Sequence, residues 1–135
     1  MKILIVTGLF LLMLCMPVKA YERDSFRKPI PFGDYVADIK PLLEEAVAAN
    51  GWTFREDQDG NYFAEIEHRR YGMKTALLVE SKEVSIKLLS VTKKRRKTKV
   101  NNKVRRWLIM LRRSIALGIT VAVRDDADRR RNKGQ

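Results

Sequence analysis

The chain has 135 residues, of which 28 are Lys or Arg and 16 are Asp or Glu, so its formal net charge is +12. This length allows one domain, and a hydrophobic fraction of 45% is too high for a disordered chain. One Cys and one His exclude a disulfide framework and a cysteine-based zinc site. We therefore expect no metal and no cofactor.

Residues 1–20 have the pattern of a secretory signal peptide. Lys2 supplies the positive start, and residues 3–16 are almost wholly apolar. Small residues at Val18 and Ala20 predict cleavage after Ala20, and hence a periplasmic or secreted protein. Cleavage removes two lysines and no acid, which leaves 115 residues with a net charge of +10.

Two other interpretations of this segment are less favoured. An uncleaved membrane anchor needs a longer apolar stretch than residues 3–16 provide. A lipoprotein acylated at Cys15 needs a small residue directly before the cysteine, and Leu14 stands there instead.

The first elements of the mature chain are a leader and a helix. Residues 21–33 contain two prolines and no periodicity, which predicts an extended leader. Asp38 is favoured over Asp34 as the cap of the next helix, because Pro41 is tolerated only in the first turn. Asn50-Gly51 then ends the helix. The apolar residues at helical spacing are Ile39, Leu42, Leu43, Ala46 and Val47.

Four runs of alternating apolar and polar residues predict four strands. The runs lie at residues 52–55, 62–67, 73–79 and 84–88. Short polar links join them, and such links suit hairpins, so we expect an antiparallel meander. Each run has one apolar face, which predicts a sheet covered on one side.

The last predicted element is a basic amphipathic helix. Asn101 or Asn102 can cap it, and Gly118 weakens its later turns. Residues 125–135 are predicted to form a basic disordered tail. The expected fold is α+β, with N- and C-terminal helices packed on one face of the four-stranded sheet and a single domain over 34–124. The apolar stripe consists of Val104, Trp107, Leu108, Leu111, Ile115 and Ile119.

Several short motifs in these elements share a pattern with known proteins. They are Asn50-Gly51-Trp52, then Gly60 with Ala64 and Ile66, then Val84-Ser85-Ile86-Lys87, and the helix over 102–111 with Trp107. The pattern resembles a family of small exported bacterial proteins, periplasmic proteins and lipoproteins, over about residues 36–115. The resemblance implies a fold and an exported location. It implies no catalytic residue, since the shared residues are core positions.

The positive charge is concentrated late in the chain. Residues 93–99 carry six cations in seven positions, a run that attracts phosphate-rich surfaces or simply keeps a loop solvated. Four arginines of the last helix recur at i, i+1, i+7 and i+8, which predicts one basic side. The candidate anion-binding residues are Lys93, Lys94, Arg95, Arg96, Lys97, Lys99, Arg105, Arg106, Arg112 and Arg113.

Signals for catalysis are weak. The only imidazole, His68, sits at the end of a predicted strand, where a structural role is expected. Residues 57–61 are similar to a calcium loop but lack its closing Glu, so we expect a hairpin turn there. There is no Gly-rich phosphate loop and no Gly-x-Ser-x-Gly motif.

These observations predict a non-enzymatic envelope protein. Its basic surface would bind anionic envelope components, lipid head groups or lipopolysaccharide. Nucleic acid is less favoured, because aromatic residues are sparse near the cations and Trp107 is expected in the core. The alternative is a module that binds another envelope protein through the open sheet face, with the charge serving solubility.

Overall fold

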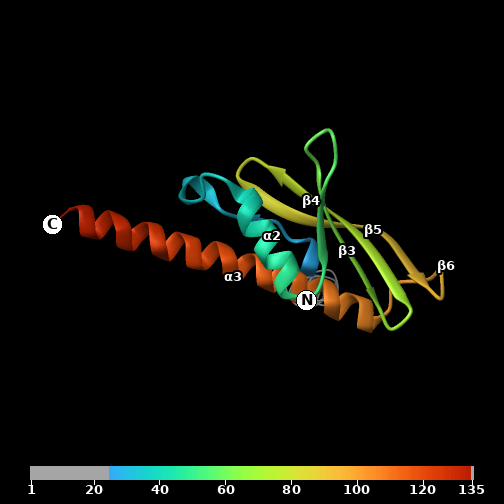
Figure 1. The fold of residues 1–135 in the computed structure, drawn as a ribbon. Helices are drawn as coiled ribbons and strands as arrows, with labels where there is room; N and C mark the ends of the chain where they lie inside the picture. The colour runs from blue at the N-terminus through green and yellow to red at the C-terminus, as the bar shows by residue number, and fades with distance from the viewer. Residues whose placement is uncertain (1–24, 135) are drawn as a thin grey trace, which may run out of the picture.

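The computed structural model describes residues 25–134, so the predicted signal peptide lies outside the described residues. The fold is α+β, with two α-helices and an antiparallel sheet that share one core (Figure 1). The elements in chain order are η1 (Ser25–Arg27), β1 (Ile30–Pro31), η2 (Gly33–Tyr35), α2 (Ile39–Ala49), β2 (Thr53–Glu56), β3 (Tyr62–His68), β4 (Tyr71–Glu80), β5 (Glu83–Lys93), β6 (Arg96–Lys97) and α3 (Asn102–Lys133).

The sheet contains the predicted antiparallel meander and two further strands. Its order is β1-β5-β4-β3-β2, and β6 also pairs with β5. The prediction of four strands is therefore incomplete. Both additions are two residues long, too short to produce an alternating pattern in the sequence. They pair with the two ends of β5 and so cover part of its free edge.

Residues 25–33 are part of the folded domain, which corrects the predicted extended leader over 21–33 for these described residues. Phe26, Ile30 and Phe32 are buried in the core. Ile30 pairs with Val84 of β5, and the backbone N–H of Phe32 donates to the carbonyl of Lys82. The missing periodicity is explained by the leader's irregular path, in which two 3₁₀ turns flank a two-residue strand.

The central strands point their predicted apolar faces into the core. On β4, Met73, Thr75 and Leu77 are buried, and the Thr75 hydroxyl donates to the carbonyl of Ala64 on β3 at 3.0 Å. A bulge shifts the pairing of β4 with β5 after Lys74. The extra residue breaks the alternation on β5, which explains why this strand is longer than the predicted run over 84–88.

The first helix forms as expected. The Asp38 side chain accepts a hydrogen bond from the Lys40 N–H at 3.1 Å and caps α2, and Pro41 lies in the first turn. Asn50 and Gly51 end the helix, with Gly51 at φ +77°. α2 buries Ile39, Leu43, Ala46 and Val47.

The last helix is longer than predicted. Its cap is Asn101, whose side chain accepts from the Val104 N–H at 2.9 Å. The helix continues to Lys133, so the predicted disordered tail over 125–135 is wrong as far as that residue. Arg130 pairs with Asp126 and Arg131 with Asp128 along the helix, which supports turns that have no core contact. Figure 1 shows these turns projecting beyond the sheet.

Candidate anion-binding site at the basic end

Two cationic hairpin turns lie side by side at one end of the sheet. Strands β4 and β5 pair Tyr71 with Lys93, so the turn before Tyr71 and the turn after Lys93 are neighbours. The backbone N–H of Lys94 donates to the carbonyl of Arg70 at 2.9 Å and joins the two turns. We call the cationic residues of these turns and of β6, together with Lys93 at the end of β5 and Lys103 at the start of α3, the basic end (Figure 1). They are Arg69, Arg70, Lys93, Lys94, Arg95, Arg96, Lys97 and Lys103.

Both turns place charged residues in a conformation that favours glycine. Each is a two-residue hairpin loop whose central residues both have positive φ: 49° and 70° at Arg69 and Arg70, 54° and 66° at Lys94 and Arg95. Such turns usually carry Asn-Gly, because the left-handed conformation costs other L-residues about 1–2 kcal/mol each. The fold therefore tolerates strain at the positions that carry these cations.

A cavity of about 320 Å³ opens between the turns. Four of its lining residues are permanent cations, and Glu67 is the one carboxylate among them. The lining residues are Glu67, His68, Arg69, Arg70, Tyr71, Gly72, Thr92, Lys94 and Arg95. A small cavity with this charge surplus suits an anion.

Aromatic rings hold the lysines beside this cavity. The Lys93 ammonium lies 5.3 Å from the centre of the Tyr71 ring, and the Lys103 ammonium lies 5.8 Å from it. Lys103 also faces the ring of Trp107 at 5.7 Å, and His68 packs edge-on to the same ring. Cation–π contacts of this kind bring the start of α3 up to the two turns.

The positive environment of the basic end affects the pKa of the Tyr71 hydroxyl. The Asn101 side-chain amide donates to it at 3.1 Å and lowers the pKa of Tyr71 below its usual 10.0. The ammonium groups of Lys93 and Lys103 lower this pKa further, because they stabilise the phenolate. Asn101 thus has two roles, since it also caps α3.

The predicted basic residues are only partly brought together. Lys93 to Lys97 form the β5–β6 hairpin, whereas Arg112 points to the leader, where its Nε donates to the carbonyl of Lys28 at 3.0 Å. Arg105 is half-buried and donates to the side chain of Asn102 at 3.2 Å. The other three predicted cations, Lys99, Arg106 and Arg113, are exposed outside the cavity.

The sequence interpretation missed Arg69, Arg70 and Lys103. From the sequence, residues 69–72 are predicted only as a short polar link between two strands. A signal was present, since Arg69-Arg70 and Lys94-Arg95 are both cationic pairs that can form two-residue loops. In an antiparallel meander, alternate turns meet at the same end of the sheet.

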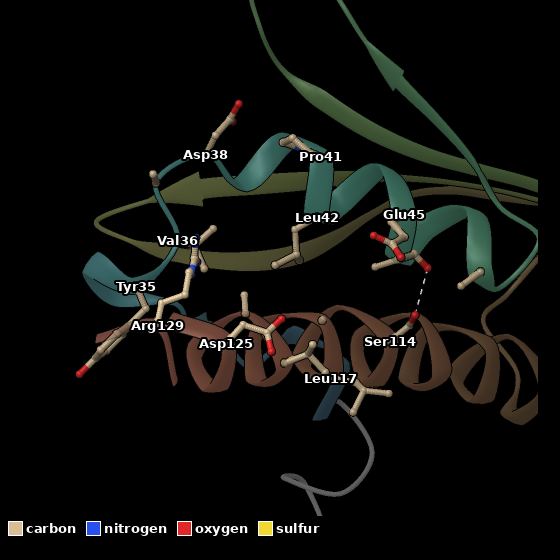
Figure 2. A pocket seen from close by; sticks show the side chains of 16 residues that line it. Tyr35, Val36, Asp38, Pro41, Leu42, Glu45, Ser114, Leu117, Asp125 and Arg129 are labelled. Atoms are coloured by element: carbon tan, nitrogen blue, oxygen red, sulfur yellow. Dashed lines mark hydrogen bonds between the residues drawn. The ribbon is translucent and has the colours of Figure 1, made fainter. Parts of the chain in front are cut away.

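A second cavity has a different character. A groove of about 580 Å³ lies between α2 and α3, and Leu117, which is 63% exposed, lines it. Figure 2 shows the side chains around this groove. The Ser114 hydroxyl bridges the two helices by donating to the carbonyl of Ala46 at 3.0 Å. Three carboxylates line this groove against one arginine, so its charge does not suit an anion. They are Asp38, Glu45 and Asp125, and the arginine is Arg129.

The open face of the sheet is mostly charged. Glu65 lies 3.1 Å from an Arg55 Nη and 3.7 Å from Lys74 Nζ. The same two cations lie over the half-buried ring of Phe63, at 5.0 and 5.7 Å from its centre. Arg55, Glu65 and Lys74 therefore neutralise one another on this face.

Comparison with known proteins adds no family assignment. Over residues 25–134, no helix is both long enough and apolar enough to cross a membrane, and no cluster of three or more potential metal ligands occurs. No protein-family model matches the chain, and no curated protein matches it either. The likeness to small exported bacterial proteins remains a resemblance of core motifs.

Proposed function

We propose that this chain is a non-enzymatic binding module of the bacterial cell envelope. Its basic end attaches to surfaces rich in phosphate, such as anionic lipid head groups or lipopolysaccharide. The observation that carries the proposal is the pair of cationic turns joined by the hydrogen bond from Lys94 to Arg70. Export of the chain rests on the apolar N-terminal segment and on the cleavage pattern at Ala20.

The lack of carboxylate partners for the cations of the two turns supports this proposal. Within residues 25–134, no ion pair neutralises Arg69, Arg70, Lys94 or Arg95. The first turn of α3 carries no acid, although acids are favoured at a helix N-terminus. Unneutralised cations beside the positive end of a helix dipole attract anions more strongly than cations paired with carboxylates.

The absence of a catalytic role is also part of the proposal. His68 is exposed and packs edge-on to Trp107, at 5.6 Å between ring centres. Two sides of the imidazole thus face solvent and an indole, and no ion pair or hydrogen bond orients it within the described residues. A general base is normally held by such a bond.

Docking of a protein on the open sheet face has less support. The ion pairs centred on Glu65 occupy that face, and desolvating them would oppose association. Among the described strands, the exposed large apolar residues are Leu78 on β4 and Leu89 on β5, at 41% and 44%, which is little apolar surface for a protein interface.

Vesicle binding of the mature chain tests the proposal. The test variant replaces Lys94, Arg95, Arg96 and Lys97 with Ser, and the control variant replaces Arg129, Arg130, Arg131 and Lys133 with Ser. Both lose four cations, so they have the same net charge. We expect the first to weaken binding to anionic vesicles by at least about tenfold, since each cation near such a surface contributes about 1 kcal/mol. The control should change binding much less.

Salt and lipid composition complete this test. Binding to anionic vesicles should fall as salt rises, and neutral vesicles should not bind. No binding to anionic vesicles at low salt would contradict the proposal. So would equal losses in the two variants, because the location of the charge would then be unimportant.

A further inference from the structure

We infer that the cavity between the β3–β4 and β5–β6 turns is a pocket selective for phosphate monoesters. The inference rests on the proposed function and deepens it, because it distinguishes one phosphate chemistry from another. The basic end as a whole attracts any anionic surface. The cavity is expected to bind a terminal phosphate group more tightly than the bridging phosphate of a diester.

The first argument comes from the three two-residue hairpin turns of the described sheet. The β4–β5 turn, Ser81-Lys82, also has positive φ at both residues, 51° and 59°. Its charge and backbone are used by the fold, since Lys82 forms an ion pair with Asp34 and its carbonyl accepts from the Phe32 N–H. The two turns at the basic end have the same strained geometry, but their four cationic side chains have no carboxylate partner among residues 25–134. Strain without an internal partner is typical of binding sites.

The second argument comes from charge. The four cations that line the cavity exceed its one carboxylate, Glu67, by three charges. A phosphate monoester carries about −1.5 to −2 at pH 7, and a diester carries one negative charge. Because Coulomb attraction scales with the charge of the ligand, this surplus favours the monoester.

The third argument comes from hydrogen-bond geometry and size. Three of the four cations are arginines, Arg69, Arg70 and Arg95, and each guanidinium can donate two parallel hydrogen bonds to phosphate oxygens. A monoester presents three terminal oxygens and a diester presents two. A volume of about 320 Å³ accommodates a phosphate with an attached glycerol or sugar.

The main experiment compares vesicles of phosphatidic acid, a monoester, with vesicles of phosphatidylglycerol, a diester. The two sets are matched for zeta potential, so that the general attraction of the basic end is equal. We expect the wild-type chain to bind phosphatidic acid at least about tenfold more tightly, the effect of one additional charge-assisted hydrogen bond.

Turn replacements link this preference to the cavity. The test variant carries Arg69→Asn, Arg70→Gly, Lys94→Asn and Arg95→Gly, and the control carries Ser81→Asn and Lys82→Gly. Asn-Gly suits the positive φ angles of these turns, so we expect both variants to fold. If the Tm of each variant is at least that of wild type, a change in its preference for phosphatidic acid does not come from misfolding. We expect the test variant to lose the preference for phosphatidic acid and the control to keep it. A glutamine version of the four cationic positions, which keeps side-chain length, should lose the preference as well.

A competition experiment distinguishes a soluble phosphate monoester from a monoester head group held in a bilayer. Release from phosphatidic acid vesicles by soluble glycerol 3-phosphate would identify the phosphate monoester itself as sufficient. Preference without release would identify the head group held in a bilayer. Equal binding of the two matched vesicles, or a preference that survives in the test variant, would overturn the inference and leave the proposed function standing. Binding to neither vesicle would instead refute the proposed function.

Discussion

Asp57 shows how one side chain organises a turn. Its carboxylate accepts hydrogen bonds from the backbone N–H groups of Asp59 and Asn61, at 3.0 and 2.9 Å, and from the Asn61 side-chain amide at 3.1 Å. These bonds stabilise the charged form and lower the pKa of Asp57 below its usual 3.8. The segment that is similar to a calcium loop is thus a β2–β3 hairpin turn, as its sequence predicts.

This turn predicts a specific loss of stability in acid. Because the pKa of Asp57 is lower in the folded state than in the unfolded state, the carboxylate stabilises the fold above the unfolded pKa of 3.8. That contribution disappears as pH falls through the folded pKa. Urea unfolding at about pH 6 and about pH 2.5 should show a larger loss for wild type than for Asp57→Asn. Asp59→Asn is the control, because Asp59 gives the turn only its backbone N–H, and it should behave as wild type. Equal losses in all three proteins would contradict the prediction.

At the scale of elements, helices and strands with a repeating apolar pattern were predictable from the sequence, whereas irregularities that occur once were not. The five-residue stripe of α2 and the Asp38 cap follow directly from spacing and from the position of Pro41. The bulge on β5 inserts a single residue, which ends the alternation after Leu88 although the strand continues. The apolar periodicity of a sequence does not predict a single inserted residue of this kind.

The candidate site was half predictable for a related reason. The run over 93–97 can be recognised in the sequence by its charge. That Arg69-Arg70 lies beside this run is known only from the pairing of Tyr71 with Lys93. Arg69-Arg70 also lacks the usual sequence signal of its turn, because two-residue hairpins with positive φ normally carry Asn-Gly. Conversely, Arg112 has the spacing of a surface cation but is held by the leader carbonyl of Lys28.

The contact between α2 and α3 yields a prediction about two glycines. A Cβ at Gly118 would lie 3.3 Å from Leu42 Cδ2, and Leu42 borders an open groove into which it can move. Gly118→Ala should therefore raise the free energy of unfolding by up to about 1 kcal/mol through helix propensity. Gly51→Ala should lower it by about 1 kcal/mol, because φ is +77° there and no steric contact is involved. Denaturant unfolding measures both, and destabilisation by Gly118→Ala would mean that Leu42 cannot move.

At the scale of the whole molecule, the structure consists of a packed body and a projecting helix end. α3 has 32 residues, and its last buried apolar residue is Ile119. Val123, half-buried, still packs against the core. The turns beyond Asp125 are held by local ion pairs such as Arg130 with Asp126, which contribute little to global stability.

Truncation tests this division of the molecule. A chain ending at Asp125 should keep its Tm within about 2 °C of wild type while losing helical circular dichroism, because the removed turns bury no apolar side chain. Ile119→Ala, six residues upstream, should lower the free energy of unfolding by about 2–4 kcal/mol, since Ile119 is 4% exposed. A large drop in Tm on truncation would show that the projecting turns support the body.

The length of α3 has a consequence for how the protein meets charged surfaces. At 1.5 Å per residue the helix is about 48 Å long, and it has cations near both ends. The Debye length in physiological salt is about 8 Å, so the two cationic ends do not sense each other's field. Residues 124–133 at the far end carry five Arg or Lys against three Asp, a small positive surplus. An anionic surface bound at the basic end lies outside the field of these residues, so charge substitutions at the two ends should act independently.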